Sequence, residues 1–181
     1  MNSDLKSSGE QRFSKLKKSE YFSNVLEGEN VFIAAGCSIG DNGFGFERNE
    51  TGFIVPYIRR PHPYKVILED NVEVASLVSI DRGRHRDTIV GRGTKIDHHV
   101  HIGHNAIIGK HCLLCAHANI GGSCEIGDGC HIWMSATIID HVKIANNVTI
   151  GAGSLVLHDI TEPNTTWAGN PATKLRDKQV Y

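Results

Sequence analysis

The sequence predicts an all-β protein whose fold is a left-handed parallel β-helix. An aliphatic residue stands at every sixth position from Val90 to Val156, and a small or apolar residue follows four positions after each one, as far as Ser154. Neither the helical period of about 3.6 residues nor simple strand alternation keeps a six-residue repeat in phase for so long, whereas a parallel β-helix does. Three repeats make one triangular coil of about 18 residues, so residues separated by one coil length should stack.

The two series define the expected core. The first, whose side chains we expect to point inward, consists of Val90, Ile96, Ile102, Ile108, Leu114, Ile120, Ile126, Ile132, Ile138, Ile144, Ile150 and Val156. The second consists of Thr94, Val100, Ala106, Cys112, Ala118, Cys124, Cys130, Ala136, Val142, Val148 and Ser154. Glycine often follows the inward aliphatic, as in Ile102-Gly103, and we expect the chain to turn a corner there that favours an unusual φ.

The β-helix is predicted over residues 27–160, with two excursions. The same register appears before the long array at Ile33, Ile39, Leu68, Val74 and Ile80. Breaks in this register place loops at residues 44–64 and 82–87. Loops on a rigid scaffold often carry binding groups. The first loop is rich in aromatic and cationic residues. Two interpretations of it therefore stay open with equal weight, a contact with substrate or another subunit and an insertion without function.

The two ends are predicted to differ from the coils. Residues 1–26 form a polar segment, and Ser8–Glu27 lacks a β register and is predicted to be a weak helix. Its apolar anchors are Phe13, Leu16 and Tyr21. Residues 161–181 are predicted to cap the β-helix, beginning with the turn Thr161–Asn164.

Composition narrows the class of protein. A length of 181 residues suits one domain, and a net charge of −1 gives no electrostatic reason to expect a nucleic acid partner. The polar N-terminal segment does not resemble a signal peptide, and no stretch is apolar enough to span a membrane. We therefore expect a cytoplasmic protein with no membrane partner.

Five cysteines are present, and three of them fall in the second inward series. Cysteine at such a position acts as a small hydrophobe. Cys112 and Cys130 are one coil length apart and should stack about 4.8 Å from each other, which permits contact or a disulfide. The odd total in a chain without a signal peptide favours thiols. Cys115, at a corner, has no evident base and is a poor nucleophile candidate.

Histidines are frequent, with eleven in the chain. We expect His101 and His131 to point outward from flat faces. The predicted corner histidines are His98, His99, His104, His117 and His141. One coil length beyond His104 stands Gly122, at the same corner of the next coil. An imidazole can act as general base, and an unobstructed glycine N–H can stabilise an oxyanion. By itself this pairing is weak evidence, because a corner histidine is commonly just exposed to solvent.

Four separated motifs give the pairing a context. The run Ile102–Gly109, Ser79–Gly83, Asp41–Phe46 and Ile160–Pro163 together resemble the UDP-3-O-acylglucosamine N-acyltransferases of lipid A synthesis. The likeness covers roughly residues 30–165 in order. It implies a homotrimer of left-handed β-helices with active sites between neighbouring subunits.

The same resemblance implies roles for individual residues. His104 matches the general base, Gly122 the oxyanion-hole glycine, and Asp97 an acidic partner that would fix the ring tautomer. His141 matches a second site histidine. Substrate binding is expected from the two excursions, through Phe44, Phe46 and Arg82.

Two departures bear on the substrates. The family carries an N-terminal uridine-binding domain and a C-terminal extension that helps to engage acyl carrier protein, and this sequence is too short for either. The ending Trp167–Ala172 instead resembles the close of hexapeptide-repeat sugar acetyltransferases that use acetyl-CoA. We therefore expect Gly169, Asn170 and Pro171 to bind acyl-CoA.

The main functional prediction is transfer of an acyl group, acetyl from acetyl-CoA, to the amine of an amino sugar in surface polysaccharide synthesis. The acceptor is a small molecule that can be nucleotide-linked. The alternative is a lipid A type N-acyltransferase with an acyl carrier protein donor. In either case no covalent acyl-enzyme and no metal are expected.

Two rival functions use the same fold. A γ-type zinc carbonic anhydrase shares the motif Gly103–Ala106, but its second ligand histidine would stand at Gly109. Because several imidazoles must converge on one zinc ion, this loss counts against a metal site. A non-catalytic assembly subunit would leave the pairing of His104 with Gly122 unexplained.

Overall fold

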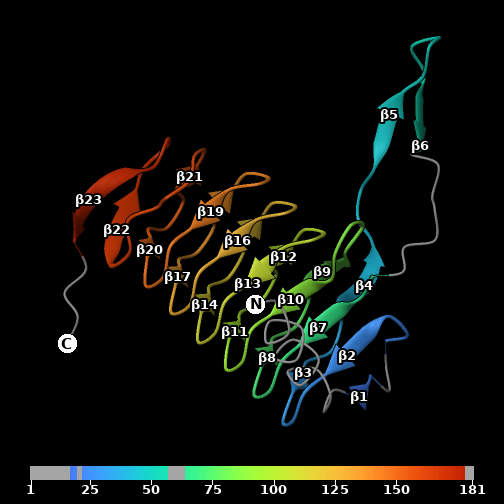
Figure 1. Ribbon diagram of the computed structural model, residues 1–181, viewed down its shortest axis with the longest axis horizontal. Helices are drawn as coiled ribbons and strands as arrows, with labels where there is room; N and C mark the ends of the chain where they lie inside the picture. Colours follow the sequence, from blue (N-terminus) through green and yellow to red (C-terminus); the bar gives the residue numbers. More distant parts are fainter. Residues whose placement is uncertain (1–16, 20–21, 57–63, 178–181) are drawn as a thin grey trace, which may run out of the picture.

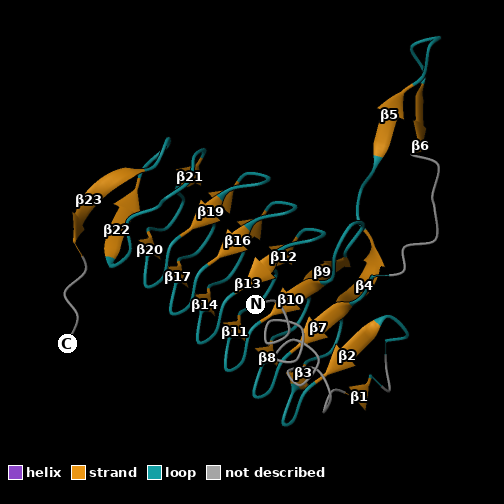
Figure 2. Cartoon of the chain, viewed as in Figure 1, coloured by secondary structure: helices purple, strands orange, loops and turns teal. Residues whose placement is uncertain are grey.

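A computed structural model describes residues 17–19, 22–56 and 64–177. The chain winds as a left-handed parallel β-helix whose coils stack from β2 to β22 (Figure 1). None of the described residues is helical, and no helix able to cross a lipid bilayer is found among them (Figure 2). The predicted fold class is confirmed.

Three sheets form the sides of the triangular coil, and a hairpin stands apart from them. Sheet A, in spatial order, contains β1 (Lys17–Lys18), β2 (Val25–Glu27), β7 (Val66–Leu68), β10 (Thr88–Val90), β13 (Ile107–Ile108), β16 (Glu125–Ile126) and β19 (Lys143–Ile144). Sheet B contains β3 (Phe32–Ile33), β8 (Glu73–Val74), β11 (Lys95–Ile96), β14 (Leu113–Leu114), β17 (His131–Ile132), β20 (Thr149–Ile150), β22 (Thr165–Ala168) and β23 (Thr173–Asp177). Sheet C contains β4 (Ser38–Asn42), β9 (Ser79–Arg82), β12 (His101–Ile102), β15 (Asn119–Ile120), β18 (Thr137–Ile138) and β21 (Leu155–Val156). The hairpin consists of β5 (Phe46–Arg48) and β6 (Ile54–Pro56).

The coil length in the long array is the one that three hexads predict. In sheet C, Ile120 pairs with Ile102 on one side and with Ile138 on the other. Every member of the two predicted inward series is buried, with an exposed fraction of at most 4%. The core is thus a column of stacked aliphatic and small side chains, as the hexad predicts.

The glycines that follow the inward aliphatics have a different role from the one predicted. Gly103 and Gly109 are absent from the positive-φ positions, which fall two residues later, at Asn105 (60°) and His111 (54°). A Cβ on Gly103 would lie only 2.7 Å from the backbone nitrogen of Gly122 on the next coil. Glycine is therefore required there for the close approach of two coils, and the predicted location of the unusual φ was wrong.

The corner geometry also accounts for part of the histidine content. Four histidines, namely His99, His111, His117 and His141, have φ between 54° and 68°. Asparagine, aspartate and histidine are enriched in this left-handed region among non-glycine residues. Histidine at a corner of this fold therefore needs no catalytic explanation.

The predicted N-terminal helix is wrong wherever that segment is described. Lys17–Lys18 forms β1, and Val25–Glu27 forms β2, which pairs in parallel with β7. Val25 is fully buried at an inward position, so its side chain belongs to the first coil. The segment's apolar anchors Phe13, Leu16 and Tyr21 lie outside the described residues.

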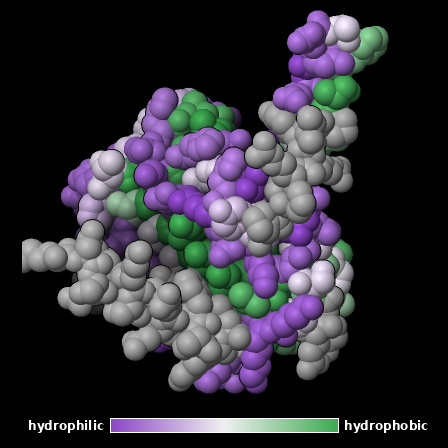
Figure 3. Space-filling view, turned by 45° about the vertical axis from the view of Figure 1, so that its right-hand side comes forward, coloured by the Kyte–Doolittle hydropathy of each residue, from purple (hydrophilic) through white to green (hydrophobic). Residues whose placement is uncertain are grey.

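The chain leaves the coil after Asn42, and the hairpin of β5 and β6 projects from the N-terminal half of the body (Figure 1). This projection carries both hydrophilic and hydrophobic residues (Figure 3), with Phe53 and Ile54 both more than half exposed. At the other end, β22 extends sheet B in parallel and β23 pairs antiparallel with β22.

No disulfide joins the five cysteines. Cys112, Cys124 and Cys130 are buried, as expected for small core residues. A hydrogen bond with Cys130 and burial together raise the pKa of the Cys112 thiol, and burial raises that of Cys124 to about 11. These groups are thiols rather than thiolates at neutral pH.

Two consecutive leucines on β14 test the inward register. Leu114 is 1% exposed and Leu113 is 45% exposed. We expect Leu114→Ala to lower the free energy of unfolding by about 2–5 kcal/mol, because a buried leucine loses its packing and leaves a cavity. Leu113→Ala, the matched control, should cost much less. Urea unfolding measures both, and equal losses would contradict the register.

Candidate active site

A groove of about 540 Å³ runs across the outer face of sheet C. It crosses β9, β12, β15 and β18, which are consecutive in that sheet. Successive coils therefore line it with residues from equivalent positions of the repeat. Its lining consists of Phe44, Asp81, His101, Gly103, His104, Asn119, Ile120, Gly121, Gly122, Thr137, Ile138, Ile139 and Asp140.

The floor of the groove is a column of polar side chains. His101, Asn119 and Thr137 line the groove from the same outward position on β12, β15 and β18, and Ser79 occupies that position on the preceding strand, β9. The Ser79 hydroxyl lies 2.8 Å from Nδ1 of His101. Hydroxyl, imidazole and amide groups in one row can hydrogen-bond a polar ligand such as a sugar. The outward direction of His101 was predicted, but its membership of a site was missed.

His104 stacks on Gly122, as the coil length predicts. A Cβ built on Gly122 would lie 2.8 Å from Cε1 of the His104 ring and 3.1 Å from Nε2. The ring therefore occupies the space that any other side chain at position 122 would fill. Glycine at this corner is what allows the imidazole to lie along the groove.

The partner of the His104 ring is Asn105. The Asn105 side-chain amide lies 2.8 Å from Nδ1 of His104, and Asn105 is only 3% exposed. The residue predicted to fix the ring, Asp97, is not brought to it within one chain. The Asp97 carboxylate instead accepts the backbone N–H groups of His98 and Ala116. Their separation along the chain places Asp97 at a different corner, so its predicted contact with His104 is wrong within the chain.

The Gly122 N–H is not unobstructed, contrary to the prediction. It donates to Oδ1 of Asp140 at 2.8 Å. The same kind of hydrogen bond, from a backbone N–H to a carboxylate on the next coil, recurs at another corner, where the Lys110 N–H donates to Asp128 at 2.7 Å. The Gly122 N–H can therefore bind a ligand only after Asp140 turns away. Gly122 has no side chain, so among the described residues no side-chain oxygen of the next coil accepts the backbone N–H of His104.

Asp81 lines the same groove as His104, and Gly43 lies close to both side chains. A Cβ built on Gly43 would lie 2.9 Å from Oδ2 of Asp81 and 3.0 Å from Cδ2 of His104. Burial raises the pKa of the Asp81 carboxyl, and Asp41 adds to this, while the nearby imidazoles oppose it. Asp81 belongs to the motif Ser79–Gly83, but no role was predicted for it, because only the stacking of β9 on β12 brings it into the groove.

The predicted substrate-binding residues divide between the groove and its surroundings. Phe44 lines the groove with 90% of its surface exposed, and its ring centroid is 4.8 Å from that of Phe46. Arg82 donates from Nε to Asn42 Oδ1 at 2.9 Å and does not line the groove. His141 is exposed, follows Asp140 at the corner, and also lies outside the lining of its own chain's groove.

The predicted cofactor-binding residues lie at the C-terminal end of the same face. Gly169, Asn170 and Pro171 form the turn between β22 and β23 and are exposed. The carbonyl of Gly169 accepts the N–H of Leu155, which belongs to the strand of sheet C that follows the groove. None of the three lines the groove itself.

A second cluster lies on sheet B. A hollow of about 350 Å³ is lined in part by Phe32, Asp97, Leu113 and Cys115. The Cys115 Sγ lies 3.3 Å from Nε2 of His131, a contact that the sequence did not suggest. Burial raises the pKa of the Cys115 thiol, which opposes thiolate formation. No group of three metal-binding side chains is found in the part of the chain that the structure describes.

Comparison with known families identifies the repeat. The bacterial transferase hexapeptide family, described by six repeats, matches residues 87–122 and 123–158. The matched segments include His104, Gly122 and Asp140.

Curated relatives carry one activity in their names. A UDP-3-O-acylglucosamine N-acyltransferase from Methylorubrum populi is 37% identical over 153 residues, covering 84% of this chain and 42% of the relative. A probable mitochondrial UDP-3-O-acylglucosamine N-acyltransferase from Arabidopsis thaliana is 41% identical, covering 87% of this chain and 51% of the relative. The chain thus spans about half the length of the curated relatives it matches.

Solved structures share the fold at lower sequence identity. The UDP-N-acetylglucosamine O-acyltransferase of Moraxella catarrhalis superposes with a TM-score of 0.73 at 20% identity, covering 84% of this chain and 56% of that one. A variant of AntD, an N-acyltransferase from Bacillus cereus in complex with dTDP and coenzyme A, gives 0.65 at 13% identity and covers 91% of both chains. At these identities the likeness shows the β-helix fold.

Alanine at position 122 tests the packing of the site. The φ of Gly122 is not in the left-handed region, so the backbone accepts alanine, but the new Cβ would lie 2.8 Å from the His104 ring. We expect a crystal structure of Gly122→Ala to show the imidazole displaced and its contact with Asn105 broken. The melting temperature should stay close to that of the exposed-corner control Ser135→Ala. A ring left in place would contradict the stacking.

Proposed function

The chain is a hexapeptide-repeat β-helix protein similar to the UDP-3-O-acylglucosamine N-acyltransferases, and we propose that it is an acyltransferase that forms an amide on an acylated glucosamine. The observation that carries this proposal is the groove in which the His104 ring lies on Gly122. Both residues fall within the part of the chain that the hexapeptide family matches. The polar floor beside them suits a sugar acceptor.

Amide formation from a thioester makes two demands on the site. A group must accept the proton of the attacking amine, and a donor must stabilise the oxyanion of the tetrahedral intermediate. The groove offers His104 and Asp81 as titratable groups in one lining. The general-base role predicted for His104 requires a lone pair on Nε2, the ring nitrogen that has no partner among the described residues.

We propose a donor in which acyl carrier protein carries the acyl group. The names of the curated relatives, which act on an acylated glucosamine, support this alternative over the acetyl-CoA predicted from the C-terminal motif. In addition, Gly169, Asn170 and Pro171 do not line the groove. The coenzyme A named with AntD belongs to a protein of only 13% identity.

The groove gives the acceptor two kinds of contact. Asn119 and His101 would hydrogen-bond sugar hydroxyls from the floor. Phe44, which is largely exposed at the rim and pairs with Phe46, offers an aromatic face on which the base of a nucleotide-linked sugar can stack. Arg82 stands on β9 where that strand pairs with β4, and its charge suits the diphosphate.

A homotrimer would complete the site. Asp97 and His141 lie outside the groove of their own chain, so as functional residues they would act at a neighbouring subunit's groove. Closed rotational symmetry repeats such a heterologous contact at every interface. The solution mass, measured by light scattering, tests this assembly directly.

The activity itself is tested with purified protein and UDP-3-O-acylglucosamine as acceptor. We expect amide formation with an acyl-acyl carrier protein donor, and slower or no turnover with acetyl-CoA. His104→Ala should lower kcat by about 10²–10³-fold, because the ring serves the reacting atoms as base or as donor.

His158→Ala is the matched control, since this exposed corner histidine does not line the groove. It should leave turnover unchanged. Near-normal kcat for His104→Ala would overturn the assignment of the reaction centre to this groove.

A further inference from the structure

The corner that carries His104 is bonded to the coil before it in a different way from the corner that follows. Asn105 and Ser123 are the residues with positive φ at these two corners. The Ser123 N–H donates to the carbonyl of His104 on the preceding coil, at 2.8 Å. The Asn105 N–H donates instead to the hydroxyl of Thr88, at 2.9 Å, because the excursion at residues 82–87 replaces the regular corner there. Side chains therefore take over part of the bonding at the corner of His104.

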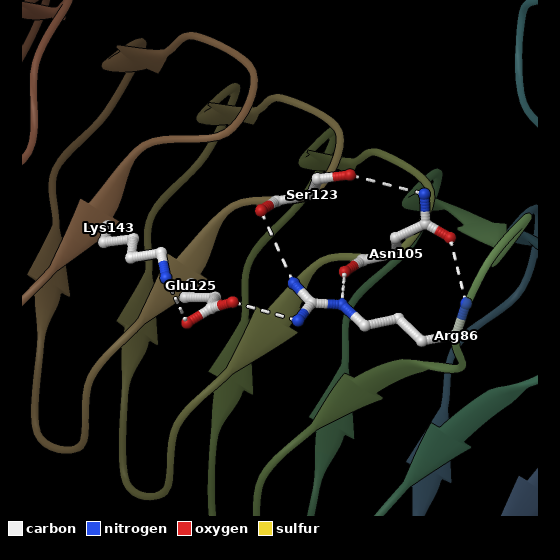
Figure 4. Close-up of polar contacts among 5 residues, drawn as sticks. All are labelled: Arg86, Asn105, Ser123, Glu125 and Lys143. Carbon is white, nitrogen blue, oxygen red and sulfur yellow. Dashed lines mark hydrogen bonds and ion pairs between the residues drawn. The ribbon is translucent and has the colours of Figure 1, made fainter.

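Arg86, in that excursion, spans two successive coils with one guanidinium group (Figure 4). Its Nε donates to the carbonyl of Asn105 at 2.9 Å, and a terminal nitrogen donates to the carbonyl of Ser123 at the longer distance of 3.5 Å. Asn105 directly follows His104 in the chain, and Ser123 directly follows Gly122. One planar group thus contacts the backbone next to the imidazole and the backbone next to the glycine on which the imidazole lies.

A carboxylate holds the guanidinium in this orientation. The other terminal nitrogen of Arg86 donates to Glu125 at 2.9 Å, and Lys143 lies 3.5 Å from the same carboxylate. The hydrogen bond from Arg86 lowers the pKa of Glu125, which keeps the carboxylate charged at neutral pH. The Arg86 and Glu125 side chains are 39% and 38% exposed, and ion pairs open to solvent contribute little to stability. The pair therefore orients the guanidinium more than it stabilises the fold.

The backbone of the excursion is fixed to the same corner. The N–H groups of Arg84 and His85 donate to Oδ1 of Asn105, at 2.6 and 2.8 Å. Asn105 is only 3% exposed, so bulk solvent does not compete with these hydrogen bonds. The Arg86 side chain thus extends from a fixed backbone.

We propose that Arg86 is a positioning residue that sets the separation between His104 and Gly122. The inference rests on the proposed function, in which His104 accepts the proton of the attacking amine and the Gly122 N–H, once Asp140 turns away, donates to the oxyanion. Both groups act on one tetrahedral centre, and a misplacement of about 1 Å can cost about 10²-fold in rate. Arg86 touches no reacting atom and acts through the backbone.

The shape of the guanidinium is what this role requires. Arginine presents several N–H donors in a rigid plane, whereas lysine offers a compact point charge on a flexible stem. Arg86→Lys keeps a cation beside Glu125 but cannot hold the carbonyls of Asn105 and Ser123 in one plane. Arg86→Gln removes the charge as well.

Steady-state kinetics with UDP-3-O-acylglucosamine test the role. We expect Arg86→Lys and Arg86→Gln each to lower kcat by about 10-fold, less than a full 1 Å misplacement costs, with KM nearly unchanged. Arg92→Gln is the matched control, because Arg92 also pairs with a carboxylate, that of Asp70 at 3.4 Å, but neither residue lines the groove. It should leave kcat at the native value.

Amide hydrogen exchange reports on the same corner without turnover. The Ser123 N–H donates to the His104 carbonyl, and the Gly129 N–H makes the equivalent bond to Lys110 at the next corner along the chain, both at 2.8 Å. In Arg86→Gln we expect the Ser123 N–H to exchange about 10-fold faster than in the native protein, because its corner opens more often. The Gly129 N–H should exchange at the native rate.

Three results would overturn the proposal. They are unchanged exchange at Ser123, native kcat in either Arg86 variant, and a rise in KM without a fall in kcat, which would make Arg86 a substrate-binding residue. Failure of the proposed function is distinct from these, because it would show as absent turnover in the native protein. The exchange rates would still decide whether Arg86 holds the corner.

Discussion

The backbone hydrogen bonds between coils are the constraint on which the rest of the structure depends. Each coil is bonded to the next, as when the Gly121 N–H donates to Ile138 and the Ser123 N–H to His104, both at 2.8 Å. A parallel ladder of this kind sets neighbouring coils about 4.8 Å apart, so residues one coil length apart always meet. The stacked core, the polar floor and the corner of His104 are three uses of this one spacing.

Small differences at one corner turn the repeat into a candidate site. A side-chain oxygen on the next coil accepts the backbone N–H of Lys110. At His104 the next coil instead has Gly122, which has no side chain. The imidazole fills the vacated space, and Asn105 holds the ring while Asp81 lines the same groove. The fold therefore tolerates the site, because glycine removes one side-chain hydrogen bond between coils and leaves the backbone hydrogen bonds between them intact.

The hexad alone predicts the fold, the buried series and the stacking of His104 on Gly122, because all three follow from period. What it does not predict depends on chain outside the repeat. The backbone N–H groups that hold the Asn105 amide come from the excursion that includes Arg86. Val25 points inward from a segment whose repeat pattern is weak. Likewise, the resemblance suggested a contact between Asp97 and His104, whereas their spacing in a hexad repeat leads to another corner.

A crystal structure with UDP-3-O-acylglucosamine bound tests the central claim most directly, namely that the groove on sheet C is the reaction centre. We expect the sugar over His101 and Asn119, with its free amine within hydrogen-bonding distance of Nε2 of His104. A sugar bound away from this groove, or with its amine turned away from His104, would contradict the claim.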